Sequence, residues 1–288
     1  MRDYVIFVDS ACDISGEMLK KWGVRYCELS LAFSDDPKEY YDHQIPSKEF
    51  YSRMRAGAQP KTSAVNMGRF YDEFKKIVTE GYDVLYLAFS SGLSATCSFA
   101  CEAASEIMSE CSDSKIVVVD SLCASAGYGL LLKLLLDKKN EGFTIDELAD
   151  YAENTKLNVA HWFTVDDLKY LKAGGRISAT TALLGGMLNI KPVMKADNNG
   201  KLISFSKVRG RKAALAEITK YYAQTARDKQ DGLVYISHGD CIEDANLLAE
   251  MINESCGARV ELITNVGPVI GSHSGPGTLA LFFLTDER

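Results

Sequence analysis

The chain has 288 residues, of which 47% are apolar and 25% are charged, and its formal net charge is -7. This balance is typical of a globular protein with a sizeable core, and the acidic charge disfavours nucleic-acid binding, which needs a basic face. No stretch approaches the roughly 18 apolar residues that span a bilayer, and the first residues lack the apolar core of a signal peptide.

The eight cysteines are scattered along the sequence without the paired spacing of a metal-binding knuckle. Cys97 and Cys101 lie one helical turn apart, but no second histidine or cysteine pair of matching spacing accompanies them. We therefore expect reduced cysteines, no metal and no other cofactor. A chain of this size without an export signal is expected in the cytoplasm.

Strand-like and helix-like segments alternate through the first half of the chain. Short apolar runs predict strands at residues 4–8, 25–33, 84–89 and 115–119. Apolar residues at helical spacing predict helices at residues 15–22, 47–57, 67–80, 94–111 and 123–140. The polar residues 34–45 are expected to form a connection. This alternation predicts α/β structure with a mostly parallel sheet and helices on both of its faces.

The helix predicted at residues 144–154 marks the seam between two expected domains, residues 1–157 and residues 158–288. In the second half, strands are predicted at residues 159–164, 192–196, 201–208, 233–237, 259–264 and 279–284. Helices are predicted at residues 165–172, 212–227 and 242–256. Asn198-Asn199-Gly200 is a strong hairpin signal. Because hairpin and crossover signals occur together, we expect a C-terminal α/β domain with a mixed sheet.

The segment at residues 89–96 is rich in glycine and hydroxyl groups, and it connects a predicted buried strand to a predicted helix. Ligands of parallel sheets bind at such carboxyl ends of strands. The free N–H groups of a first helical turn, together with serine hydroxyls, favour an anion. The alternative is that Ser91 or Ser94 only caps the helix.

Two further segments have the same character and favour the anion site. Residues 60–66 contain Thr62 and Ser63 and precede a helix that Ser63 or Asn66 would cap. Residues 267–278 hold four glycines and two prolines around His273, which predicts a tight and exposed loop. A lone histidine is more often structural, but one in an exposed loop is free to reach a ligand. We therefore expect His273 to be functional.

Enzyme templates fit the sequence poorly. Gly92-Leu93-Ser94 resembles a nucleophile elbow, but Ala95-Thr96 stands where that motif requires its second glycine. A serine hydrolase or acyltransferase that uses Ser94 and His273 is kept as an alternative. Arg176 follows a glycine turn and would suit a carboxylate or phosphate, so a module that senses a small anion is a third hypothesis.

Taken together, these segments resemble the DegV family over essentially the whole chain. The residues that carry the resemblance are Val8-Asp9-Ser10, Thr62-Ser63, Ser90-Ser91-Gly92-Leu93-Ser94-Ala95-Thr96, Val119-Asp120-Ser121, Gly174-Gly175-Arg176-Ile177, Ile190-Lys191-Pro192, Arg209 and His273-Ser274-Gly275-Pro276-Gly277. The resemblance implies a two-domain α/β protein, the EDD fold, with one long-chain fatty acid enclosed between the domains. It also implies that Thr62 and Ser94 hold the carboxylate with Ser63 and His273 nearby, and that no residue is catalytic.

The resemblance further implies a protein partner. Members of this kind are the fatty-acid-binding subunit of bacterial fatty acid kinase. They present the carboxylate to a separate ATP-dependent kinase subunit, which forms the acyl phosphate used in phospholipid synthesis. Arg176 and Arg209 would match the family arginines on the kinase-facing surface. The implied ligand is palmitate or a similar long-chain acid, and contact with a membrane would be transient.

Two departures from the family pattern lie near the expected site. Ala64-Val65 stands where Gln-Pro usually follows Thr-Ser, and Ala95 replaces a glycine, which adds a methyl group near the carboxylate. The acyl tail needs an apolar tunnel, because each buried methylene contributes about 0.8 kcal/mol. Candidates for its lining, which would otherwise be core residues, are Leu183, Leu184, Met187, Leu188 and Ile190.

Overall fold

The computed structural model describes residues 2–178 and 189–288. The N-terminal part contains a parallel sheet with four strands, Tyr4–Asp9 (β1), Arg25–Cys27 (β2), Asp83–Ala88 (β6) and Ile116–Asp120 (β7). Their order is β2-β1-β6-β7, and each neighbouring pair is parallel. The predicted parallel sheet is therefore confirmed.

The C-terminal part contains a mixed sheet. Its strands are Val159–Thr164 (β8), Ile190–Ala196 (β9), Leu202–Arg209 (β10), Val234–His238 (β11), Leu262–Asn265 (β12) and Leu279–Leu284 (β13). In the order β10-β9-β8-β13-β11-β12, only the β11–β12 pair is parallel among the described residues. The mixed sheet and the hairpin at Asn198-Asn199-Gly200 are both confirmed.

A third, antiparallel sheet was not predicted. It consists of Ser30–Phe33 (β3), Asp36–Tyr41 (β4) and Pro60–Ser63 (β5), in the order β4-β3-β5. The strand predicted at residues 25–33 is therefore wrong as one element, because the chain leaves the parallel sheet after β2 and enters another. The polar connection predicted at residues 34–45 contains β4. Lys38 and Glu39 are exposed there, so hydropathy gave no strand signal.

The helices follow the predicted positions in most cases. They are Gly16–Lys21 (α1), Ser47–Arg55 (α2), Met67–Thr79 (α3), Thr96–Glu110 (α4), Ser125–Asn140 (α5), Ile145–Thr155 (α6), Lys169–Ala173 (α7), Arg211–Thr225 (α9), Ile242–Cys256 (α10) and Pro268–Ser274 (α11). Two short 3-10 turns lie at Ser10–Cys12 (η1) and Lys156–Asn158 (η2). No helix of the described chain is long and apolar enough to cross a membrane.

Local side-chain bonds fix several of these helix boundaries. Ser15 caps α1, and Asn66, one of the two candidates that the sequence offered, caps α3. Thr144 and Glu147 form a capping box at the start of α6. The loop predicted at residues 267–278 is wrong, because most of it is the helix α11. Its proline at the first turn and its glycine beyond the last residue are the usual boundary signals of a helix.

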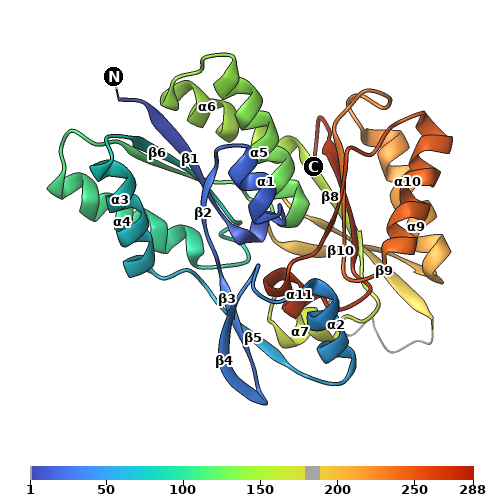
Figure 1. Cartoon of the computed structure of the whole chain (residues 1–288). Coiled ribbons are helices and arrows are strands. Elements are labelled where there is room, and N and C mark those ends of the chain that lie inside the picture. The colour runs from blue at the N-terminus through green and yellow to red at the C-terminus, as the bar shows by residue number, and fades with distance from the viewer. Residues whose placement is uncertain (1, 179–188) are drawn as a thin grey trace.

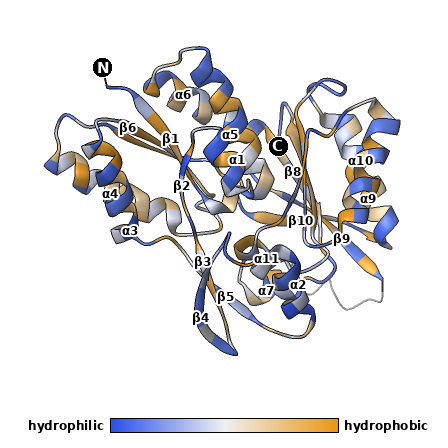
Figure 2. Ribbon diagram, viewed as in Figure 1, coloured by the Kyte–Doolittle hydropathy of each residue, from blue (hydrophilic) through white to orange (hydrophobic). Residues whose placement is uncertain are grey.

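The layers of the fold can be followed in Figure 1. Helices α3 and α4 pack on one face of the parallel sheet, and α9 and α10 pack on the outer face of the mixed sheet. Helix α5 lies between the two sheets and contacts β8, β11 and β13. It is buried on nearly all sides, as its run of leucines requires. Figure 2 shows mostly hydrophobic strands in the two larger sheets and mixed hydropathy in the helices that flank them.

Candidate functional site

A cavity of about 260 Å³ is lined by residues from the mixed sheet, from β5, from α5, α7 and α11, and from the turn that follows β6. Most of its wall is apolar. The side chains that form this apolar wall include Leu93, Phe163, Leu171, Val269, Ile270 and Phe282. A concave, mostly apolar pocket with a few polar groups is the usual form of a small-molecule site.

Nine polar residues line this cavity, and four of them, Thr62, Ser94, Arg176 and His273, are called the polar cluster here. Thr62 Oγ1 lies 2.8 Å from His273 Nε2, although the two residues are 211 positions apart in sequence. Arg176 Nε donates to the backbone oxygen of Leu93, next to Ser94, at 3.1 Å. The structure therefore brings three of the predicted carboxylate-binding residues and one predicted partner-facing arginine to one cavity wall.

His273 is neutral at physiological pH. Burial and the nearby positive charge of Arg176 lower its pKa to about 4. Its Nδ1 atom is buried and has no hydrogen-bond partner among the described residues. The ring packs so closely on Gly174 that a Cβ at that position would collide with Nδ1. The His273 ring can therefore take this position only because Gly174 has no side chain.

The turn at residues 89–96 bonds the start of α4 and also contributes to the cavity lining. Ser94 Oγ accepts from the backbone N–H of Thr96 at 3.3 Å and lies 2.9 Å from Thr96 Oγ1, so it satisfies a group in the first turn of α4. Ser94 also lines the cavity, as does Ala95. Ser91 is exposed and does not line the cavity.

The remaining predicted residues lie away from the cavity wall. Ser63 is exposed, because alternate residues of β5 point to opposite sides and Thr62 takes the inward position. Arg209 ends β10 and is exposed. Ile190 does not line the cavity, and the other tail-lining candidates, at residues 183–188, fall outside the described residues.

The geometry does not assemble the catalytic group of the hydrolase hypothesis. Ser94 and His273 form no hydrogen bond with each other within the described residues; each has another partner. No carboxylate orients His273, since its Nδ1 is unpartnered there. A nucleophilic serine requires a base within hydrogen-bond reach and a third group that orients the base. The low pKa of His273 further weakens it as a base.

Two buried carboxyl groups hold the N-terminus of α11. Asp13 Oδ1 accepts from the N–H of Gly267 and Asp42 Oδ1 from that of Val269, each at 2.9 Å. Burial raises the pKa of Asp42 to about 6, and burial together with the charge of Asp42 raises the pKa of Asp13 well above its usual range. The helix that carries His273 is therefore fixed by residues of the N-terminal part of the chain.

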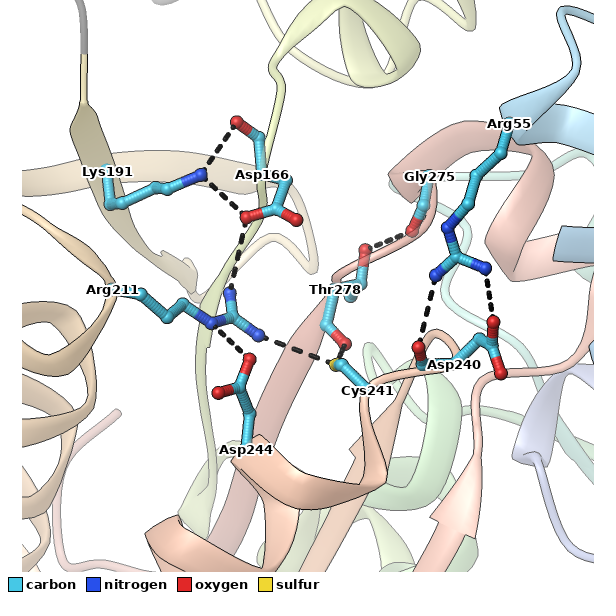
Figure 3. A network of polar contacts seen from close by, with 9 residues as sticks. All are labelled: Arg55, Asp166, Lys191, Arg211, Asp240, Cys241, Asp244, Gly275 and Thr278. Carbon is cyan, nitrogen blue, oxygen red and sulfur yellow. Dashed lines mark hydrogen bonds and ion pairs between the residues drawn. The ribbon is translucent and has the colours of Figure 1, made fainter. Parts of the chain in front are cut away.

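A polar network holds the turn that follows α11 (Figure 3). Thr278 Oγ1 donates to the Gly275 oxygen at 2.7 Å, and Cys241 Sγ donates to the Thr278 oxygen at 3.3 Å. Arg211 contacts Cys241 and pairs with Asp244 at 2.8 Å. Both ends of α11 are therefore anchored, which keeps the cavity wall in place.

Sequence reasoning missed several lining residues on the mixed sheet. His161 and Phe163 of β8 lie opposite Phe282 and Ala280 of β13, and all four line the cavity. Their spacing of two residues in each strand places them on one face of the sheet. That alternation was readable in the sequence, but the pairing of β8 with β13 was not.

The fold and the cavity define the chain as an α/β protein with a mostly apolar cavity, which is lined by the mixed sheet, β5 and three helices. A sequence model of the DegV family, described as an uncharacterised protein family, matches residues 3–286. The chain is 40% identical over 291 residues to a DegV domain-containing protein of Clostridium perfringens, covering 100% of this chain and 99% of that one. The chain belongs to the DegV family.

Solved structures share the whole fold. A DegV family protein from Thermus thermophilus, described by its fatty acid binding, matches with a TM-score of 0.88 and 29% identity, over 99% of this chain and 100% of that chain. A stearic acid-binding protein from Eubacterium ventriosum also matches with a TM-score of 0.88, at 26% identity over 98% of each chain. Both are described as binding fatty acids.

Proposed function

We propose that this protein binds one long-chain fatty acid, with its carboxylate at the polar cluster and its tail along the apolar wall of the cavity. The observation that carries the proposal is the coexistence, in one cavity, of the Thr62–His273–Arg176–Ser94 cluster and a mostly apolar lining. Hydroxyl groups give charge-assisted hydrogen bonds to a carboxylate, and buried methylenes add hydrophobic free energy. The description of relatives as fatty acid-binding supports the same ligand.

His273 has a specific part in this proposal. It is neutral, so one ring nitrogen carries hydrogen and the other does not. An unpartnered buried N–H is rarer and more costly than an unpartnered acceptor, and Nδ1 is the unpartnered atom. The proton therefore belongs on Nε2, which donates to Thr62 Oγ1. That bond leaves the Thr62 hydroxyl hydrogen free to donate to a carboxylate.

Arg176 supplies the counter-charge. Its guanidinium is half-buried, and burial lowers its pKa without removing its charge at neutral pH. Two of its nitrogens are held by backbone oxygens of Leu93 and Gly174. A carboxylate entering the cavity thus meets a fixed positive charge, which offsets part of the cost of removing the carboxylate from water.

The protein is further proposed to act without catalysing a reaction itself, as the lipid-binding subunit of a fatty acid kinase system in the cytoplasm. The separate ATP-dependent kinase subunit would phosphorylate the presented carboxylate. Arg209 is exposed and free to contact such a partner, whereas Arg176 would act from the cavity wall. Co-purification of the chain with a kinase subunit, and its loss in Arg209→Ala, tests this part.

Mass spectrometry of lipid extracted from the purified protein tests the ligand. We expect a stoichiometric long-chain fatty acid, retained by Ser91→Ala and depleted in Ser94→Ala. Ser91 is the matched control because it lies three residues away and does not line the cavity. Absence of fatty acid from the wild type, with no uptake of added palmitate, would exclude the proposal. Ester hydrolysis that Ser94→Ala abolishes would favour the hydrolase instead.

A further inference from the structure

The buried residue Ser90 lies in the turn at residues 89–96 and has no role in the site described so far. It is 0% exposed and does not line the cavity. Its backbone oxygen accepts from the N–H of Leu93 at 3.0 Å and from the N–H of Ser94 at 3.2 Å. Leu93 and Ser94 both line the cavity. Ser90 therefore holds the backbone of the residues that this turn contributes to the site.

The side chain of Ser90 connects the same turn to the mixed sheet. Its Oγ donates to the backbone oxygen of Gly200 at 3.0 Å and accepts from the N–H of Gly92 at 3.2 Å. Gly200 lies in the hairpin between β9 and β10, 110 positions away from Ser90 in sequence. One hydroxyl group, used both as a donor and as an acceptor, thus bonds the turn after β6 to a hairpin of the other sheet.

The turn and the hairpin approach closely because each has a glycine at the contact. A Cβ on Gly200 would collide with Ser90 Oγ, and a Cβ on Gly92 would collide with the Asn199 oxygen. Gly200 has a φ of 69°, a conformation that glycine adopts without strain. Leu202, two residues beyond Gly200, lines the cavity. Both sides of the contact therefore continue into the cavity lining.

Arg176 bonds the same turn from the second half of the chain. The N–H of Leu93 donates to the Ser90 oxygen, and the Leu93 oxygen accepts from Arg176 Nε at 3.1 Å. Both polar groups of the Leu93 backbone are thus fixed, and Ser94 follows immediately. Loss of the bonds around Ser90 would therefore shift Ser94 relative to the rest of the polar cluster.

We propose that Ser90 is a positioning residue for the carboxylate site, which acts by holding the turn at residues 89–96 against the β9–β10 hairpin. This inference rests on the proposed fatty acid binding and specifies how Ser94 is placed for it. A charge-assisted hydrogen bond depends on distance and angle, so a small displacement of Ser94 weakens its bond to the carboxylate. Burial of the tail is non-directional and changes little with such a displacement. The Ser90 hydroxyl therefore matters more for carboxylate recognition than for tail binding.

Delipidated full-length protein is titrated with hexadecanoate and with hexadecan-1-ol, which has the same chain length and no charge. The ratio of the two affinities measures carboxylate recognition separately from tail binding. We expect Ser90→Ala to lower this ratio by about tenfold, as for the loss of one hydrogen bond to a charged group.

Ser114→Ala is the matched control for this titration. Ser114 is also buried, and its Oγ donates to a backbone oxygen at 2.7 Å. It precedes β7, at the opposite end of the parallel sheet from Ser90, and it does not line the cavity. Ser114→Ala should therefore keep the wild-type ratio of affinities.

Gly200→Ala tests the same contact from the hairpin side and does not require Ser90→Ala to fold. Its Cβ would collide with Ser90 Oγ, so the ratio should again fall, by about fivefold or more. Combining Ser90→Ala with Gly200→Ala removes the colliding oxygen. The ratio of the double variant should therefore lie within about twofold of that of Ser90→Ala, because two changes at one contact are not additive.

Two results would overturn the proposal. One is a ratio within about threefold of the wild type in Ser90→Ala, or in Gly200→Ala if Ser90→Ala does not fold, with both affinities falling together. The other is additive losses in the double variant. Failure of the wild type to bind hexadecanoate would instead contradict the broader function, so the two failures are distinguishable.

Discussion

Replacing Thr62 with valine probes the proposed carboxylate site with almost no change in the shape of the side chain. Valine keeps the branched side chain on β5 but lacks the hydroxyl that lies 2.8 Å from His273 Nε2. Two consequences follow for ligand binding. The carboxylate loses one charge-assisted donor, and the His273 N–H loses its acceptor inside a buried site. Ser63→Ala is the matched control, because Ser63 is the adjacent residue and is exposed.

A hydrogen bond to a charged group contributes about 1.5–3 kcal/mol, which corresponds to about 10-fold to 150-fold in dissociation constant. We therefore expect Thr62→Val to weaken palmitate binding by roughly 100-fold. Ser63→Ala should stay within about twofold of the wild type. Calorimetric titration of delipidated protein measures both constants. A Thr62→Val protein that is folded and binds palmitate within threefold of the wild type would refute the assigned role of this hydroxyl.

Three further predictions concern groups around the site and in the core. Alanine is compatible with the backbone at Gly174, where φ is -76°, but its Cβ would displace His273. The affinity of Gly174→Ala for palmitate should therefore fall by about tenfold in the same titration. An unchanged affinity would contradict the close packing. Because the pKa of His273 is about 4 in the folded protein and about 6.5 when unfolded, its contribution to stability is complete above pH 6.5 and is lost as the pH falls toward 4. Urea unfolding should therefore show the wild type losing about 2 kcal/mol more than His273→Asn between pH 7 and pH 4, and parallel pH profiles would disprove this. Tyr86→Phe removes the hydroxyl that donates to the fully buried Asp9 at 2.6 Å. This change should lower the free energy of unfolding by about 1–3 kcal/mol. Tyr71→Phe, which loses only a surface bond to Glu110, should cost less than about 0.5 kcal/mol, and equal effects of the two changes would be evidence against the burial argument.

The sequence predicted those elements whose apolar pattern is local. Helix α10 begins and ends at the predicted residues because it buries one regular face, and β8 also matches because it is a short run that is buried along its whole length. Strands β4 and β5 were missed because their exposed positions carry charged and hydroxyl residues, so alternation was weak. Helix α11 was taken for a loop because its glycines outweighed the proline and glycine that mark its two ends.

The site was predictable in part for a similar reason. Thr62, Ser94 and His273 were found as residue types in favourable turns and through the family resemblance, and the structure places all three on one cavity. Ser63 points outward because residues 60–63 form the strand β5, and the sequence did not predict a strand there. That Arg176 lines the cavity depends on contacts between α7 and α11, far apart in the chain. Such tertiary placement leaves no local pattern to read.

The position of β13 has a consequence for how the protein acquires its binding site during synthesis. β13 is the last described strand of the chain, yet it lies between β8 and β11 in the mixed sheet and contributes Ala280 and Phe282 to the cavity. Until the chain has been synthesised through residue 284, β13 cannot pair with β8 and β11. Non-local strand pairing of this kind is slow, so the nascent chain exposes apolar strand edges for longer than a locally paired sheet would. The protein can therefore bind a ligand only at the end of folding. A ligand that binds only the completed mixed sheet stabilises the folded state in which β13 is in place.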